Sequence, residues 1–296
     1  MLLKVPTMRA LFASTVMKRR KLEPSIHTNL DRESDYTAYL QLDKLLDAQI
    51  PLSDPAHHDE MLFIVQHQVA ELWIKLAIHE IEAAMDDLRA DDLPMAVKKL
   101  ARVKHIQNQM YNQWTVLDTL TPSEYAQFRH VFGRASGFQS PQYRLLEFLM
   151  GNKSRSILKV YEQQPEWHER LEDALQVPAL FDEFLAYLGR QGRAIPAAVL
   201  KRDFSQARND HPGVVAVLRD IYEHPREDWA SYEMCEALMD MANNFQFWRF
   251  HHMKTVERII GHKTGSGGSS GVSFLKKALD IELFAELIQV RTEIGS

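Results

Sequence analysis

The distribution of glycine is the feature that most narrows the folds open to this chain. It has 12 glycines in 296 residues, and five of them lie between residues 261 and 271. Elsewhere apolar residues recur at the three- and four-residue spacing of amphipathic helices, and no series of alternating segments separated by turn pairs indicates strands. The sequence therefore predicts an all-α protein, a single large helical domain built around a central bundle.

Local signals mark where these helices begin and end. Residues 121–124 read Thr-Pro-Ser-Glu, a capping box with proline at the first helical position, and Gly133 is placed to end that helix. Asp54 before Pro55 is a second start signal, an N-cap residue followed by proline. The expected helices span residues 54–88, 94–120, 121–133, 140–151, 226–260 and 274–290, with shorter ones between 151 and 225.

Composition and charge exclude several classes of protein. The chain is 45% apolar and 25% charged with a formal net charge of −5, which is ordinary globular composition without a basic footprint for nucleic acid. Cys235 is the only cysteine, which excludes an internal disulfide, a cysteine-based metal site and covalent haem attachment. Uninterrupted apolar runs fall short of the ~18 residues of a membrane-spanning helix. We expect a cytoplasmic protein with neither nucleic-acid nor membrane partners.

Residues 1–22 differ from the rest of the chain. They carry six basic side chains and no acidic one before Glu23. The main basic cluster follows the apolar stretch of residues 10–17, whereas a secretory signal would place it before that stretch. We expect a disordered basic tail, with a transit peptide as the alternative, followed by one domain over residues 23–296.

Two histidines lie within strongly apolar helical segments. His67 shares a helix face with Phe63, and His252 shares one with Trp248. Each could be an ordinary core residue, or the pair could line a non-covalent haem pocket with one axial imidazole. No Glu-x-x-His or His-Glu-x-x-His pattern indicates a di-iron or zinc site, although residues 57–59 (His-His-Asp) could supply part of a mononuclear iron site.

Tyr125 and Arg129 are four residues apart on the capped helix, so a phenol and a guanidinium point the same way. Such an arginine in a cleft is suited to binding a carboxylate through two charge-assisted hydrogen bonds, whereas on a surface it would pair with a nearby acid.

The glycine-rich stretch of residues 265–271 fits neither the dinucleotide-binding nor the P-loop pattern, because Ser270 stands at the third glycine and no Gly-Lys-Ser/Thr follows. It is either a plain linker or a mobile polar loop that closes over a ligand.

Five separated motifs in this chain resemble the tryptophan 2,3-dioxygenase family, over roughly residues 22–290. They are residues 55–68 (PAHHDEMLFIVQHQ), 120–125 (LTPSEY), 136–140 (SGFQS), 247–253 (FWRFHHM) and 265–272 (GSGGSSGV).

The resemblance implies a central helical bundle that holds a b-type haem, ferrous in the active state, in a homotetramer. It also implies insertion of both atoms of O2 across the indole C2–C3 bond of L-tryptophan to give N-formylkynurenine. His252 matches the proximal haem ligand, and the residues expected to bind the cofactor with it are Trp114, Ser136, Gly137 and Gly265.

On the substrate side, His67 matches the distal catalytic histidine that hydrogen-bonds the indole N–H, and Phe63 would pack on the indole. Tyr125 and Arg129 match the residues that engage the carboxylate. Ser266 stands where the family has a threonine for the ammonium group, and it keeps the hydroxyl but loses a methyl. The resemblance also places Ile64, Val65 and Gln66 in the substrate site, and Tyr36, Tyr39 and Leu40 in the pocket of a neighbouring subunit.

Three other functions are compatible with parts of this pattern. An indoleamine-type dioxygenase would accept a broader range of substrates, and a haem or tryptophan sensor would bind without turnover. A helical scaffold would use both histidines only as core residues. The first is separated by substrate range, the second by product formation and the third by a colourless protein.

Overall fold

The computed structural model describes residues 21–28 and 35–295, and these ranges contain helices and loops but no strand. The all-α prediction is therefore confirmed. The chain forms two compact units, residues 1–48 and 49–296. Most of the predicted basic tail, residues 1–20, lies outside the described residues. A single domain over residues 23–296 stays a prediction.

The first unit contains two five-residue helices, α1 (Tyr36–Leu40) and α2 (Leu42–Leu46). Asp35 begins α1 by accepting a 2.8 Å hydrogen bond from the backbone N–H of Ala38. Neither helix buries a side chain within the chain.

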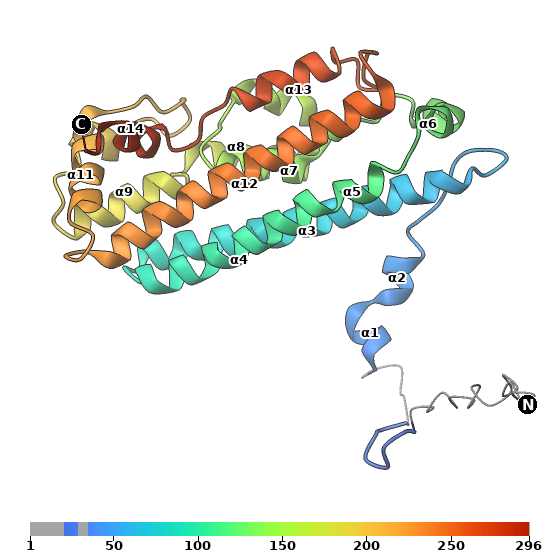
Figure 1. Cartoon of the computed structure of the whole chain (residues 1–296), viewed down its shortest axis with the longest axis horizontal. Coiled ribbons are helices and arrows are strands. Elements are labelled where there is room, and N and C mark those ends of the chain that lie inside the picture. The colour runs from blue at the N-terminus through green and yellow to red at the C-terminus, as the bar shows by residue number, and fades with distance from the viewer. Residues whose placement is uncertain (1–20, 29–34, 296) are drawn as a thin grey trace, which may run out of the picture. The chain divides into compact units, whose positions relative to one another are not determined.

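Three long helices form the centre of the second unit (Figure 1): α3 (His58–Arg89), α4 (Leu93–Asn112) and α12 (Trp229–Ile260). The helix α4 packs against both α3 and α12 along its length. Most of the residues that these helices bury are apolar, so burial of their apolar faces supplies the main stabilisation. Fully buried examples are Ile81, Leu88, Leu100, Met110 and Phe245.

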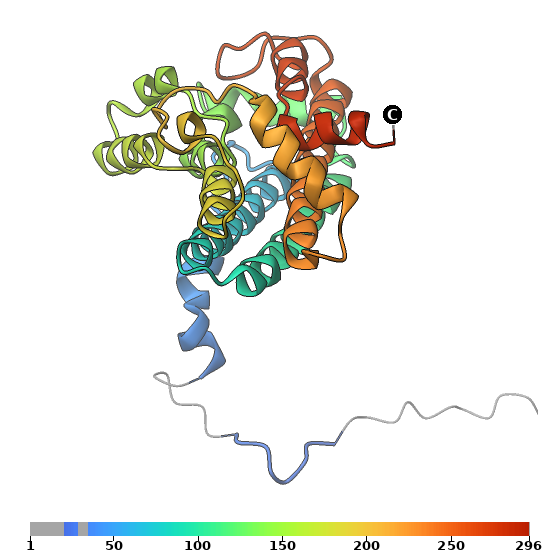
Figure 2. The same ribbon diagram turned by 90° about the vertical axis from the view of Figure 1, so that its left-hand side faces the viewer.

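Shorter helices pack around these three (Figure 2). Two groups are distinguished by their contacts. In the first, α7 (Pro141–Leu149) and α9 (Leu180–Arg190) contact α3, and α8 (Pro165–Gln176) packs on α7. In the second, α11 (Pro212–Glu223) and α13 (Val272–Leu279) contact α12, and α14 (Ala285–Glu293) packs on α11. The connecting segments contain α5 (Trp114–Leu117), α6 (Pro122–Phe128) and α10 (Ala197–Leu200), with 3-10 helices at Arg129–Phe132, Gly137–Gln139 and Arg155–Tyr161.

Several predicted helix ends are present in the structure. The side chains of Thr121 and Glu124 form the reciprocal capping box at the start of α6. Gly133, at φ 55°, follows the 3-10 turn that extends this helix, and Gly261, at φ 61°, ends α12. Both glycines adopt backbone angles that other residues rarely take, which explains why the chain stops coiling there.

The predicted start at Asp54 was wrong, because α3 begins four residues later at His58. The carboxylate of Glu60 accepts hydrogen bonds from the backbone N–H groups of Leu52 (2.7 Å) and Ser53 (3.0 Å). The hydroxyl of Ser53 in turn accepts from the N–H of His57. These bonds hold residues 52–57 in a turn, so the N-cap is His57.

Two long helices predicted from periodicity are each broken in the structure. The predicted 94–120 helix ends at Asn112 and resumes as α5. At the break the hydroxyl of Thr115 donates a hydrogen bond to the carbonyl of Asn112, which in a continuous helix would accept a backbone N–H. The 274–290 helix divides into α13 and α14, because the amide of Gln246 donates to the carbonyls of Leu279 (3.2 Å) and Ile281 (2.7 Å). Both interruptions depend on side chains that periodicity does not weigh.

Within the described ranges, α3 alone is long and apolar enough to be counted as a candidate membrane span. The core helices of water-soluble proteins pass the same test, and α3 packs against α4, α7 and α9.

Candidate functional site

A cavity of about 390 Å³ lies between α3, α12, the segment around α6 and α7, and the glycine-rich loop. Its size falls within the roughly 300–1,000 Å³ of small-molecule sites. Nine of the residues predicted for the site line it: Phe63, His67, Trp114, Tyr125, Ser136, Gly137, His252, Gly265 and Ser266.

His67 presents one ring nitrogen to the cavity in a defined state. Its Nδ1 lies 2.7 Å from the carbonyl oxygen of Phe63, and a carbonyl can only accept, so Nδ1 carries the hydrogen. In the neutral ring Nε2 is then an acceptor. Burial lowers the pKa of His67, against smaller opposing effects of the Phe63 carbonyl and Glu71, so the neutral form predominates at pH 7. His67 can therefore accept a hydrogen bond from a ligand N–H.

His252 reaches the same cavity from α12, with its imidazole stacked on the indole of Trp114. The ring centroids are 4.8 Å apart and the planes differ by 14°. Burial lowers the pKa of His252 to about 4, with a smaller contribution from repulsion by His67 when that ring is protonated. His252 is consequently neutral at pH 7, which is the form that binds a metal.

The walls around His252 fit a bound haem. The indole nitrogens of Trp114 and Trp248 are buried and have no hydrogen-bond partner in the protein. Unpaired buried donors are uncommon in native proteins, and a polar edge of a bound group would satisfy them. Among the described residues there is no cluster of three or more histidine, cysteine or acidic side chains for a metal. The iron site suggested by residues 57–59 is thus not formed, whereas a single imidazole is what a haem requires.

Tyr125 lines the cavity, while Arg129 lies beside it at the end of α6. Burial raises the pKa of the Tyr125 hydroxyl, so this group is protonated and can donate a hydrogen bond. The Nη2 of Arg129 donates to the carbonyl oxygen of Thr264 at 2.5 Å. The arginine therefore also contacts the residue directly before the glycine-rich stretch, although the two are more than a hundred residues apart in the sequence.

The glycine-rich loop is packed against the segment that follows α6. The hydroxyl of Ser266 donates to the carbonyl of Ala135 at 2.5 Å. A Cβ at Gly267 would come within 2.6 Å of the Cβ of Ser136, so only glycine allows this close approach. This contact places Ser266 and Gly265 at the edge of the cavity.

Other predicted site residues lie elsewhere. Ile64, Val65 and Gln66 do not line the cavity; Val65 is exposed and Gln66 is buried. Tyr36, Tyr39 and Leu40 belong to the first unit and are exposed there.

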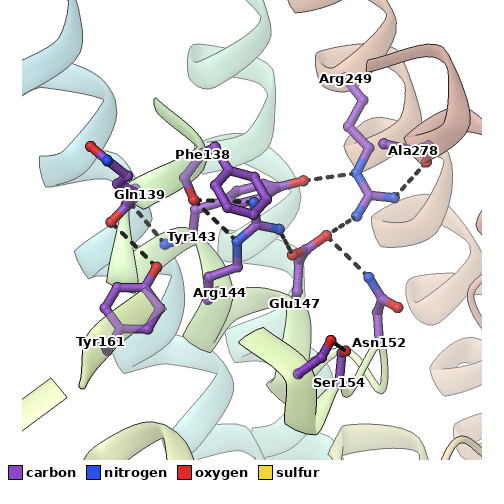
Figure 3. A network of polar contacts seen from close by, with 12 residues as sticks. Phe138, Gln139, Tyr143, Arg144, Glu147, Asn152, Ser154, Tyr161, Arg249 and Ala278 are labelled. Atoms are coloured by element: carbon purple, nitrogen blue, oxygen red, sulfur yellow. Dashed lines mark hydrogen bonds and ion pairs between the residues drawn. The ribbon is translucent and has the colours of Figure 1, made fainter. Parts of the chain in front are cut away.

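A polar network at one end of the cavity was not predicted (Figure 3). The carboxylate of Glu147 binds two guanidinium groups, those of Arg249 (2.7 Å) and Arg144 (2.5 Å), and the amide of Asn152 (3.1 Å). Arg249 also donates to the hydroxyl of Tyr143 at 3.2 Å. These residues come from α7, from the loop that follows α7 and from α12. Only Arg249 lies within one of the motifs identified in the sequence.

The wall around Phe63 is an aromatic cluster, which also exceeds what was predicted. The rings of Phe63 and Phe132 are stacked with centroids 4.5 Å apart, and the ring of His67 lies 4.1 Å from Phe63. Phe128 is fully buried behind them. Phe63 is thus held on both sides by ring contacts, and it is in direct contact with His67.

The fold and this cavity define a helical protein with a buried pocket that contains two neutral histidines, an arrangement that suits a haem enzyme. The family model described as Tryptophan 2,3-dioxygenase matches residues 25–191 and 201–294. The chain belongs to the tryptophan 2,3-dioxygenase family.

Individual relatives agree with this assignment over nearly their whole length. The tryptophan 2,3-dioxygenase of Kineococcus radiotolerans is 54% identical over 277 residues, 94% of this chain and 97% of the relative. That of Arthrobacter sp. (strain FB24) is 53% identical over 93% of this chain and 97% of its own length. That of Serratia proteamaculans is 53% identical over 95% and 100%.

Proposed function

We propose that this chain binds b-type haem through His252 and adds both atoms of O2 across the indole C2–C3 bond of L-tryptophan, which gives N-formylkynurenine. The observation that supports this most strongly is the presence of two neutral histidines in one cavity, one suited to a metal and one to an N–H donor. Haem in its ferrous state would supply the iron that binds and activates dioxygen.

The role of the protein is to hold an electron-rich indole in a dry site. Nε2 of His67 accepts a hydrogen bond from the indole N–H and so orients the indole, while Phe63 packs against the indole. The phenol of Tyr125 and the guanidinium of Arg129 bind the carboxylate. The hydroxyl of Ser266 receives the ammonium group, and the loop that carries it keeps water out of the cavity.

We infer further that the active form is a homotetramer in the cytoplasm, in which Tyr36, Tyr39 and Leu40 reach a neighbouring subunit. Tyr36 is 74% and Tyr39 84% exposed, so both aromatic side chains are available for contact with a partner. Four exposed apolar side chains also follow one face of α3, and they would suit contact with another copy: Met61, Val65, Leu72 and Leu76.

The proposal is tested with purified protein, reduced and mixed with L-tryptophan in aerated buffer, while the absorption spectrum is followed. We expect a haem Soret band and growth of the N-formylkynurenine band. A Soret band that responds to tryptophan without product would instead indicate a sensor, and the absence of a Soret band would refute haem binding.

D-tryptophan and tryptamine, assayed in parallel, report the substrate range. The carboxylate and ammonium partners predict a strong preference for L-tryptophan, whereas comparable turnover of all three would favour the indoleamine-type enzyme.

A further inference from the structure

Asp118 fastens α12 at the turns that carry His252. It is the residue that ends α5. Its carboxylate lies 2.8 Å from Nε2 of His251 and accepts a 2.6 Å hydrogen bond from the hydroxyl of Thr255. Its backbone carbonyl accepts a 3.0 Å hydrogen bond from Nε of Arg258. These three partners are spaced four and three residues apart, so they share one face of α12. A single residue at the end of α5 thus binds two turns of α12.

The helix that Asp118 ends also carries Trp114, whose indole is stacked on His252. A four-residue helix has almost no stability of its own, so its orientation depends on contacts with its neighbours. Trp114 and Leu117 supply the buried apolar contacts of α5. The hydrogen bonds of Asp118 supply a polar link between α5 and α12. Because hydrogen bonds depend on angle, they fix the orientation of α5 against α12 more narrowly than apolar packing does.

His251 depends on the same carboxylate. Its Nδ1 is buried and without a hydrogen-bond partner, so Asp118 provides the polar contact of this ring in the part of the chain that the structure describes. Loss of the carboxylate would leave both ring nitrogens of His251 unpaired, directly beside His252.

We propose that Asp118 is a positioning residue for His252: it holds α5 against α12 and thereby fixes the rotation of the His252 imidazole against Trp114. The proposal rests on the proposed binding of haem by His252. Outer partners that orient a metal ligand typically change metal affinity by roughly 10- to 100-fold when they are removed.

The test compares Asp118→Asn with Asp240→Asn in the full-length, haem-loaded protein. Asp240 forms an ion pair with Lys104 (2.5 Å) and so joins α12 to α4, but it lies about 18 Å along the helix from His252. Three quantities are measured: the rate of haem transfer to apomyoglobin, the iron–histidine stretching frequency of the ferrous protein, and the melting temperature.

We expect Asp118→Asn to lose haem roughly ten-fold faster and to shift the iron–histidine frequency, while Asp240→Asn changes neither. Wild-type haem loss and frequency in Asp118→Asn, or equal shifts in both variants, would overturn the proposal. If Asp118→Asn fails to fold, Thr255→Val and Thr255→Ser carry the test, since only serine keeps the hydroxyl bonded to Asp118; identical haem loss in these two variants would overturn it. A wild-type protein that binds no haem would refute the proposed function itself.

Discussion

Replacement of Arg129 by alanine should remove most of the preference for a substrate that carries a carboxylate. The guanidinium has five N–H donors, and the structure uses one nitrogen, Nη2, for the carbonyl of Thr264. The remaining donors can form two charge-assisted bonds with a carboxylate. A pair of this kind contributes about 2–3 kcal/mol, which corresponds to a roughly 30- to 150-fold loss of kcat/KM.

The same substitution also releases the glycine-rich loop from Arg129, and the assay must separate these two effects. Tryptamine lacks the carboxylate, so a loosened loop lowers kcat/KM for tryptamine and L-tryptophan alike. We therefore expect the ratio of the two kcat/KM values to fall roughly 30- to 150-fold in Arg129→Ala. The exposed Arg134, replaced by alanine, is the matched control for the loss of a nearby positive charge, and it should leave the ratio unchanged.

An unchanged ratio in Arg129→Ala would refute the carboxylate role, even if both activities fell. Arg129→Lys refines the result, because lysine keeps the charge but not the planar fork. It should recover part of the ratio.

Three further outcomes are expected. Ser266→Thr keeps the hydroxyl bonded to Ala135 and adds a methyl worth about 0.8 kcal/mol if buried, so the KM for L-tryptophan should fall by up to about four-fold; a higher KM would contradict this. Glu147→Gln leaves the buried guanidinium of Arg249 and the partly buried one of Arg144 without their charge partner, and it should lower the unfolding free energy in urea by about 3 kcal/mol. A change below about 1 kcal/mol would show that the network contributes little. Burial raises the pKa of Glu60, but hydrogen bonds from Leu52 and Ser53 outweigh burial, so the pKa is lowered overall. The ionised carboxylate therefore stabilises the fold above the unfolded pKa near 4.5, and this stabilisation disappears as the pH falls below that value. The difference in melting temperature between wild type and Glu60→Gln should therefore be large at pH 7 and shrink through pH 4; a constant difference would contradict the assignment.

The helical fold could be predicted because its signals are local. Apolar spacing and the capping box at Thr121 act within one or two turns of the chain, and the structure contains both the long helices and the capping box. The start of α3 could not be predicted from Asp54, since Glu60 reaches back to bind the turn before the helix. The break before Trp114 likewise depends on a side chain that competes for a backbone carbonyl.

The candidate site was predictable where motifs from the family carry it. His67 and His252 lie on helices far apart in sequence, and the resemblance named both before the structure brought them to one cavity. Phe132 and Glu147 were missed because stacking and ion pairing across separate helices have no fixed spacing in the sequence. Asp118 was missed for the same reason, since its partners lie more than 130 residues away.

The proposed reaction inserts both atoms of dioxygen into the indole of L-tryptophan. It is tested most directly by turnover under isotopically labelled dioxygen in unlabelled water, with the product analysed at once by mass spectrometry. We expect N-formylkynurenine that carries both labelled oxygen atoms. A product with one labelled atom, or with none, would contradict it.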